Sequence, residues 1–316
     1  EINAAEGVFR LGLSTGSSPV FIYKELVDLY NQGKVSFQNV EVYSIDEYYP
    51  APADSFSRNR RLYQDFVAKV DIKPENVHVP KLSEVHDSTY VTEFCAAYDA
   101  KATGLDFLVM GTGENGQIGF NEAGASEQSR TRTVLLPYDS RKRQARNFAG
   151  DIAKTPNSAI AMGISTMMTA KKIYLIAWGE DKAKVVKSIV EEKPDPTCPA
   201  SLLQKHGNIS FYVDENSASL LTREVAPWLV GPCEWSPKFI RKAVVWLCEQ
   251  VHKPILKLTQ KDYLTNGLGE LLEKYGAYDQ INIKVFNDLQ HTISGWPGGK
   301  PNADDSTRPV PSTPFP

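Results

Sequence analysis

Four hydroxyl side chains and one glycine follow the first apolar run of the sequence and precede a segment of helical period. They are Ser14, Thr15, Gly16, Ser17 and Ser18, with Pro19 next. Hydroxyl groups, a glycine and the exposed backbone N–H groups of a helix start can together hold an anion such as a phosphate. The same residues also suit an ordinary turn in which a hydroxyl group caps the helix. The segment has neither the lysine of a Walker A loop nor the glycine spacing of a dinucleotide-binding loop.

Two adjacent carboxylates, Asp46 and Glu47, follow the second apolar run. Ligands of open α/β sheets bind at the carboxyl ends of the strands, so an acidic residue that emerges there is placed to act as a general base. If the strand continues through both residues, their side chains point in opposite directions, and at most one of them faces a site. The alternative is that Asp46 caps the turn after the strand.

A glycine-rich segment, residues 111–122, follows another apolar run and has four glycines within nine residues. The glycines allow the backbone to approach a ligand closely, Asn115 and Gln117 offer amide groups, and Glu122 is titratable. Two cations extend this set of candidates. Arg146 ends a short basic helical segment, and Lys182 opens a later helix, where it is a candidate for a second phosphate contact.

The apolar runs are short and alternate with segments of helical period, which is typical of an α/β fold with a mostly parallel sheet. We predict strands at residues 8–13, 40–45, 107–110, 159–162, 173–178 and 209–213. Amphipathic helices at 20–32 and 181–190 should pack on this sheet. Because the carboxyl ends of parallel strands meet at one edge, the polar segments should converge there.

The pattern changes near residues 232–237. We predict an α/β domain over residues 1–232, a helical extension over 233–296 with helices at 239–251 and 267–275, and a Pro-rich linker over 297–316. A linker with nothing to join predicts that the natural chain continues into a further covalently linked domain. The start of the sequence, without an initiator methionine, predicts missing residues there too.

Charge and composition indicate a small-molecule partner. The 316 residues carry 35 basic and 38 acidic side chains, a net charge of −3 that gives no basic excess for a nucleic acid or an anionic membrane. No apolar run is long enough to span a bilayer. The four cysteines and five histidines are scattered without metal-ligand spacing, so we expect no metal site, no disulfides and a reducing cytoplasm.

With these segments in order, residues 8–230 resemble the glucosamine-6-phosphate deaminase (isomerase) family. The family's phosphate loop, T-G-G/S-T/S-P, corresponds to residues 15–19, and its D-E-Y segment to residues 46–48. Its G-x-G-x-N/D-G-H-I-x-F-N-E loop corresponds to residues 111–122, and S-R-T-R to residues 129–132. The resemblance implies a modified Rossmann-like sheet with helices on both faces. It places the phosphate on the 14–18 turn, Arg146 and Lys182, and implies catalytic roles for Asp46, Glu47, Asn115, Gln117 and Glu122.

The resemblance also implies an activity without metal or cofactor: conversion of glucosamine 6-phosphate to fructose 6-phosphate and ammonia in amino sugar metabolism, by a homo-oligomer. Asp46 would remove the C2 proton. The family opens the sugar ring with a histidine, but this sequence has Gln117, which cannot shuttle a proton. Loss of a general acid–base group costs about 10²–10⁴ in rate, which Glu122 or water would partly offset. Two alternatives stay open: a non-catalytic sugar-phosphate-binding domain that acts as a sensor, and a hydrolase similar to 6-phosphogluconolactonase.

Outside the catalytic loops the sequence departs from the family. The positions of an activator-binding serine and lysine correspond to Ala125 and Val134, which puts an activator site in doubt. The helix expected before the first strand is mostly missing. Residues 238–316 resemble the connector of bacterial proteins that fuse a deaminase-like domain to a zinc-dependent deacetylase, although no zinc motif of that enzyme is present.

Overall fold

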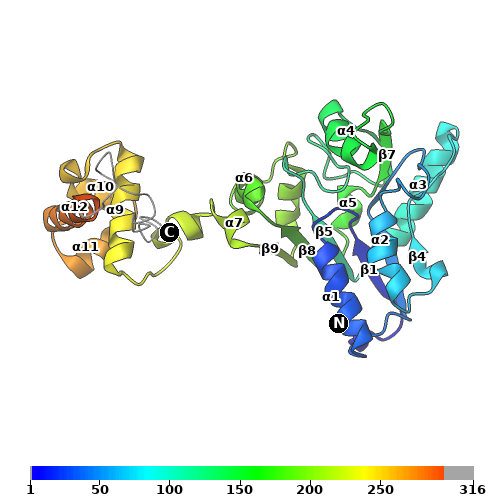
Figure 1. Ribbon diagram of the computed structural model, residues 1–316, viewed down its shortest axis with the longest axis horizontal. Helices are drawn as coiled ribbons and strands as arrows, with labels where there is room; N and C mark the ends of the chain where they lie inside the picture. Colours follow the sequence, from blue (N-terminus) through cyan, green and yellow to red (C-terminus); the bar gives the residue numbers. More distant parts are fainter. Residues whose placement is uncertain (1, 295–316) are drawn as a thin grey trace, which may run out of the picture. The chain divides into compact units, whose positions relative to one another are not determined.

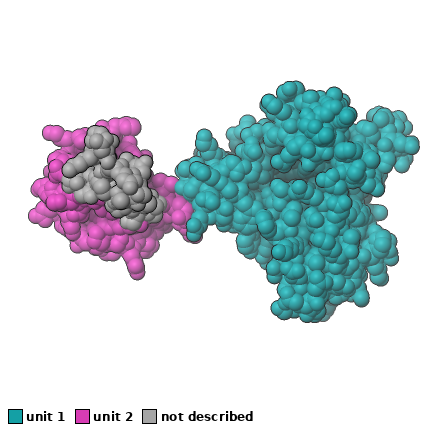
Figure 2. All heavy atoms as spheres, viewed as in Figure 1, with its two compact units in different colours: residues 1–220 teal, residues 221–316 magenta. Residues whose placement is uncertain are grey.

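A computed structural model describes residues 2–294 and divides the chain into two compact units. Unit 1 is Glu1–Leu220 and unit 2 begins at Leu221 (Figure 2). The division lies twelve residues before the domain boundary expected at 232/233. The expected Pro-rich linker, residues 297–316, lies outside the described residues.

Unit 1 is built on a six-stranded parallel sheet with the strand order β4-β2-β1-β5-β8-β9 (Figure 1). In that order the strands are Val77–His78, Val40–Ser44, Phe9–Leu13, Phe107–Gly111, Ile173–Ala177 and Ile209–Val213. The inner strands are apolar almost throughout because helices cover the sheet on both faces. The predicted α/β fold with a mostly parallel sheet is therefore confirmed.

Alternation along the strands creates two hydrophobic cores, one on each face of the sheet. The helices of unit 1 are α1 Val20–Asn31, α2 Arg60–Asp65, α3 Ser88–Ala102, α4 Tyr138–Gln144, α5 Ile164–Met167, α6 Ala183–Val190 and α7 Glu215–Ala218. Leu11 and Leu13 of β1 pack in one core with residues of α1 and α2, while Leu108 and Met110 of β5 pack in the other with residues of α3, α5 and α6. Both helices predicted on this sheet form, although the second begins as a 3-10 turn, η5 (Glu180–Lys182), before α6.

A second, three-stranded sheet has the order β3-β7-β6 and is antiparallel. Its strands are Asp46–Tyr48, Ser158–Ala161 and Arg132–Leu135. The strand predicted at 159–162 thus forms, but it pairs with β3 and β6 and does not extend the parallel sheet. The two sheets are joined at Ile45, whose backbone N–H donates to Leu13 (3.2 Å) and whose carbonyl accepts from Met162 (2.8 Å). This junction sets Asp46 at the carboxyl edge of the parallel sheet.

Unit 2 is a helical unit with its own core. Its helices are α8 Thr222–Val225, α9 Pro237–Val251, α10 Gln260–Thr265, α11 Gly269–Tyr275 and α12 Tyr278–Ser294. Trp228 and Trp235 pack with the apolar side of α9, and the buried Tyr263 hydroxyl donates to Asn282 (2.7 Å). The helical extension expected here is therefore present. Among the helices of residues 2–294, none combines the length and the apolar composition of a membrane span.

The start of α10 in unit 2 depends on one carboxylate, Asp262. Lys253 Nζ lies 2.7 Å from Asp262 Oδ1, and Asp262 Oδ2 accepts from the backbone N–H and the hydroxyl of Thr259, both at 2.8 Å. The Lys253 ammonium and the Thr259 N–H lower the pKa of Asp262 to about 2. The pKa of an aspartate in the unfolded chain is near 3.9. Because the pKa of Asp262 is lower in the folded state, its charged carboxylate stabilises the folded state at pH values above about 4, and this stabilisation is lost as the pH falls through the folded-state pKa.

We therefore expect Asp262→Asn to lower the free energy of unfolding of unit 2 by about 1–3 kcal/mol at neutral pH, because hydrogen bonds to a charged group are lost. The difference from wild type should shrink as the pH falls from about 4 to about 2, where the carboxylate is protonated. Urea unfolding followed by tryptophan fluorescence, which Trp228, Trp235 and Trp246 report from this core, measures it. Glu273→Gln removes the same charge from an exposed position on α11 as a control. A difference that stays constant with pH would contradict the assignment.

Candidate active site

A hollow of about 270 Å³ lies where β1, β2, β5 and β8 end. It brings together residues that are far apart in the sequence. These are the turn at residues 14–18 after β1, which we call the hydroxyl turn, Asp46 at the start of β3, the glycine-rich loop after β5, and cations from the 3-10 turns η4 (Ala145–Phe148) and η5. Of the expected site residues, those that line it are Ser14, Gly16, Ser17, Ser18, Asp46, Gln117, Arg146 and Lys182. Thr15 lies just behind, in contact with Asp46.

The hydroxyl turn is not used to cap the helix that follows it. Pro19 is the N-cap residue of α1, and no side chain caps this helix start. The turn is instead held by two hydrogen bonds at Ser14: the buried Tyr23 hydroxyl donates to the Ser14 carbonyl (2.5 Å), and the Ser14 hydroxyl accepts from the Gly111 N–H (3.3 Å). Uncapped N–H groups and small hydroxyl side chains at one rim of the hollow are suited to hold an anion.

Asp46 is fully buried and its two carboxylate oxygens differ in their surroundings. Oδ1 accepts from the Thr15 hydroxyl (2.9 Å) and from Arg58 Nε (3.2 Å). Oδ2 has no hydrogen-bond partner within the described residues. A side chain at Gly119 would place Cβ only 2.9 Å from Oδ2, so the space beside this oxygen requires a glycine. A buried carboxylate oxygen without a donor is costly, and a bound ligand can supply the missing proton.

Arg58 is the counterion of Asp46, and sequence reasoning missed it. Its side chain is 14% exposed, its guanidinium lies 4.7 Å from the centre of the Phe120 ring, and Nη1 donates to Gln144 Oε1 (3.3 Å). Burial opposes the charge of Arg58, but the Asp46 carboxylate and the Tyr48 side chain outweigh it and raise its pKa above the usual value. The signal in the sequence was a loop with three arginines within four residues, 58–61.

Glu47 faces away from the hollow, although the resemblance implied a catalytic role. Its carboxylate accepts hydrogen bonds from the backbone N–H groups of Tyr48 and Arg58, both at 2.9 Å, from Asn59 Nδ2 (2.9 Å) and from the Ser57 hydroxyl. The expectation that at most one of the paired carboxylates faces the site agrees with this geometry. Glu47 folds the 57–59 segment back so that Arg58 reaches Asp46.

The glycine-rich loop brings only one of its three candidate side chains to the hollow. Gln117 lines it, lies flat against Gly113, and accepts the backbone N–H of Asn115 at Oε1 (3.0 Å). The Asn115 side chain is exposed and does not line the hollow. Glu122 turns to α4, where its carboxylate accepts from the Ser140 hydroxyl. Its place in a catalytic motif did not reveal this orientation.

Cations outnumber carboxylates around the hollow. Arg146 and Lys182 were expected here, and Arg58 and Arg143 join them. The carboxylates that line the hollow are Asp46 and Glu114. Within residues 2–294 no group of three or more metal-ligating side chains is present. The arrangement is thus a cationic hollow with a hydroxyl rim and one buried carboxylate, which suits a small phosphorylated molecule and proton transfer to or from it.

Comparison with known proteins identifies the class. Residues 1–211 match the family described as glucosamine-6-phosphate isomerases/6-phosphogluconolactonase. The chain therefore belongs to this family, and the predicted resemblance is confirmed. A 6-phosphogluconolactonase structure from Thermotoga maritima, with a TM-score of 0.51 and 17% identity over 66% of this chain and 86% of that one, shares the fold.

Within the family, the similar relatives carry the deaminase name. A glucosamine-6-phosphate deaminase-like protein of Bacteroides thetaiotaomicron is 46% identical over 97% of this chain, which spans only 46% of the relative's length. Glucosamine-6-phosphate deaminase of Beutenbergia cavernae is 40% identical over 67% of this chain and 81% of its own. A solved structure described as a monomeric glucosamine-6-phosphate deaminase is 32% identical, with a TM-score of 0.62 over 67% of this chain and 88% of that one.

Glu47→Gln tests whether this carboxylate holds the 57–59 segment. The glutamine amide would direct its NH₂ group toward N–H groups that donate to the carboxylate in the wild type, such as those of Arg58 and Asn59. We therefore expect the free energy of unfolding to fall by about 1–3 kcal/mol. Urea unfolding followed by circular dichroism measures it, with Glu25→Gln, an exposed position on α1, as the charge-matched control. An unfolding midpoint equal to that of the control would contradict the anchoring role.

Proposed function

We propose that this chain is an aminosugar-phosphate deaminase that converts glucosamine 6-phosphate to fructose 6-phosphate and ammonia. One observation carries the proposal: the buried Asp46, whose Oδ2 has no hydrogen-bond partner within the described residues, lines the same hollow as the hydroxyl turn, Arg146 and Lys182. A phosphate on the turn and the cations would hold C6, and the carbon chain would extend toward Asp46. Family membership and relatives named as deaminases support this assignment.

The chemistry needs one base and a polar surround. Asp46 Oδ2 takes the proton from C2 of the open-chain amino sugar, which leaves an enolamine between C1 and C2. Return of a proton to C1 gives an imine at C2, and water hydrolyses this imine to the ketone with release of ammonia. Thr15 and Arg58 hold Oδ1 throughout, so that Oδ2 keeps its direction.

Ring opening is the weak step of this proposal. Gln117 can hold a sugar hydroxyl group but cannot carry a proton between the C1 hydroxyl and the ring oxygen. Glu122, which was expected to cover part of this role, has its carboxylate on Ser140 and does not line the hollow. We therefore propose slow turnover on the ring-opened fraction of the substrate. The same glutamine favours the second candidate, a sugar-phosphate-binding domain without turnover.

The proposed cellular location is the cytoplasm. The four cysteines are free, which supports this location. The family resemblance implies a homo-oligomer, and this stays a prediction. The solved relative at 32% identity is described as monomeric.

Ammonium release from glucosamine 6-phosphate tests the proposal, and Asp46→Asn should lower it by about 10²–10⁴ because the base is lost. Asp54→Asn, at a 91% exposed side chain of the same unit, is the matched control and should leave the rate unchanged. Ammonium no faster from wild type than from Asp46→Asn, together with thermal stabilisation by the sugar phosphate, would assign the binding domain instead.

Gln117→His tests which step limits the rate. A histidine restores a group that can take and give a proton, so turnover should rise by about tenfold or more and gain a pH limb near 6.5, the ordinary histidine value. Gln117→Asn removes the contact over Gly113 without adding a titratable group and serves as the comparison. Equal rates for the histidine and asparagine variants across pH 5–8 would mean that ring opening does not limit turnover.

A further inference from the structure

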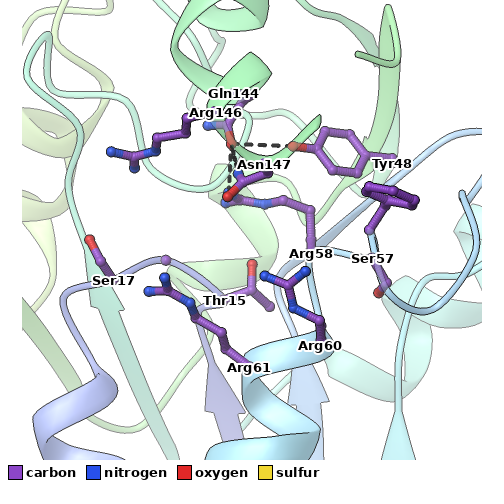
Figure 3. A pocket seen from close by; sticks show the side chains of 12 residues that line it. Thr15, Ser17, Tyr48, Ser57, Arg58, Arg60, Arg61, Gln144, Arg146 and Asn147 are labelled. Carbon is purple, nitrogen blue, oxygen red and sulfur yellow. Dashed lines mark hydrogen bonds between the residues drawn. The ribbon is translucent and has the colours of Figure 1, made fainter. Parts of the chain in front are cut away.

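A second cavity, of about 330 Å³, adjoins the hollow and is surrounded by arginines. Its cationic lining residues are Arg58, Arg60, Arg61 and Arg146, and we call it the arginine cavity. Figure 3 shows Arg60 and Arg61 rising from α2 on one side and Arg146 coming from the α4–η4 side. The remaining lining residues are neutral: Thr15, Gly16, Ser17, Tyr48, Phe56, Ser57, Gln144 and Asn147.

The positive charge of the arginine cavity is largely uncompensated. Arg58 is paired with Asp46, and Arg60 donates to the carbonyl of Ser55, which carries no charge. Neither Arg61 nor Arg146 has an ion-pair partner within the described part of the chain. Guanidinium groups that converge on a cavity without a carboxylate favour a ligand with phosphate or carboxylate oxygens.

The walls of the arginine cavity are held in place before any ligand binds. Gln144 Oε1 accepts from Tyr48 Oη (3.2 Å), Arg58 Nη1 (3.3 Å) and Asn147 Nδ2 (3.2 Å), drawn as dashed lines in Figure 3. The Phe56 ring stacks on Phe148, with centroids 5.4 Å apart, and so joins the chain just before Arg58 to η4. A cavity built in this way pays little ordering entropy on binding.

The arginine cavity and the hollow adjoin. Both are lined by Gly16, Ser17, Arg58, Gln144 and Arg146, so a ligand in the hollow lies next to the arginine cavity. Together they carry six cationic side chains and two carboxylates, a formal excess of four positive charges. A phosphate monoester brings a charge of about −1.5 to −2 near neutral pH, which leaves roughly half of that excess unmatched.

We propose that the arginine cavity binds a second anionic group of the molecule whose 6-phosphate occupies the hollow. The preferred ligands are then sugar phosphates that carry a further phosphate or carboxylate, and Arg60 and Arg61 select them over monophosphates. This inference rests on the proposed function for the place of the 6-phosphate. It concerns binding, so it holds whether or not the chain deaminates its ligand.

Isothermal titration calorimetry with sugar phosphates that have no amine separates the inference from the proposed activity. The pairs are glucose 6-phosphate with glucose 1,6-bisphosphate and fructose 6-phosphate with fructose 1,6-bisphosphate, with 6-phosphogluconate as the carboxylate probe. At least one doubly anionic ligand should bind wild type about tenfold or more tighter than its monophosphate, the size of one or more charged hydrogen bonds.

In Arg60→Gln/Arg61→Gln this preference should fall to within about twofold, while monophosphate affinity changes little. Lys69→Gln/Lys73→Gln removes the same charge from exposed positions of unit 1 and should keep the preference. Equal affinities for single and double anions in wild type would overturn the inference. A second result would also overturn it: no preference for a double anion, together with binding of inorganic phosphate to protein that is already saturated with a monophosphate. If that binding required Arg60 and Arg61, the arginine cavity would take a free anion and not a second group of the same ligand.

Discussion

Burial of the Asp46 carboxylate is the constraint on which the rest of the site depends. A carboxylate without solvent is tolerated only beside an opposite charge and hydrogen-bond donors. Thr15 and Arg58 supply these from two separate elements, and both contacts go to one oxygen. The second oxygen is thereby left without a hydrogen-bond partner among the described residues.

The position of Asp46 follows from the meeting of two sheets. Ile45 completes the hydrogen bonding of β2 against β1 on one side and accepts from Met162 beside β7 on the other. Backbone bonds from both sheets therefore fix the residue before the carboxylate, and β3 begins with the carboxylate itself. A site residue carried on strands in this way is held more rigidly than one on a free loop.

The sequence was sufficient to predict the parts of this structure that follow from local pattern. The apolar runs predicted β1, β2, β5, β8 and β9 of the parallel sheet but not the short strands β3, β4 and β6. The rule that ligands bind at the carboxyl ends of strands brought the hydroxyl turn and Asp46 together. The pairing of residues 159–162 was beyond it, because a buried strand has the same apolar pattern in a parallel or an antiparallel sheet. Arg58 was missed because its position depends on the hydrogen bonds from residues 57–59 to Glu47, which is eleven residues away and outside any periodic segment. For Glu122, the motif marked the residue but not the direction of its side chain.

Arg58 connects the two cavities physically, since one guanidinium pairs with Asp46 and also lines the arginine cavity. An anion that accepted hydrogen bonds from Arg58 would compete with Asp46 and Gln144 for its N–H groups. The competition is reciprocal: if an anion bound to Arg58 weakens the Arg58–Asp46 ion pair, that ion pair weakens binding of the anion by the same free energy. Recognition in the arginine cavity and the geometry of the proposed base therefore cannot vary independently, and an account of the ligand that considers Asp46 alone omits its counterion.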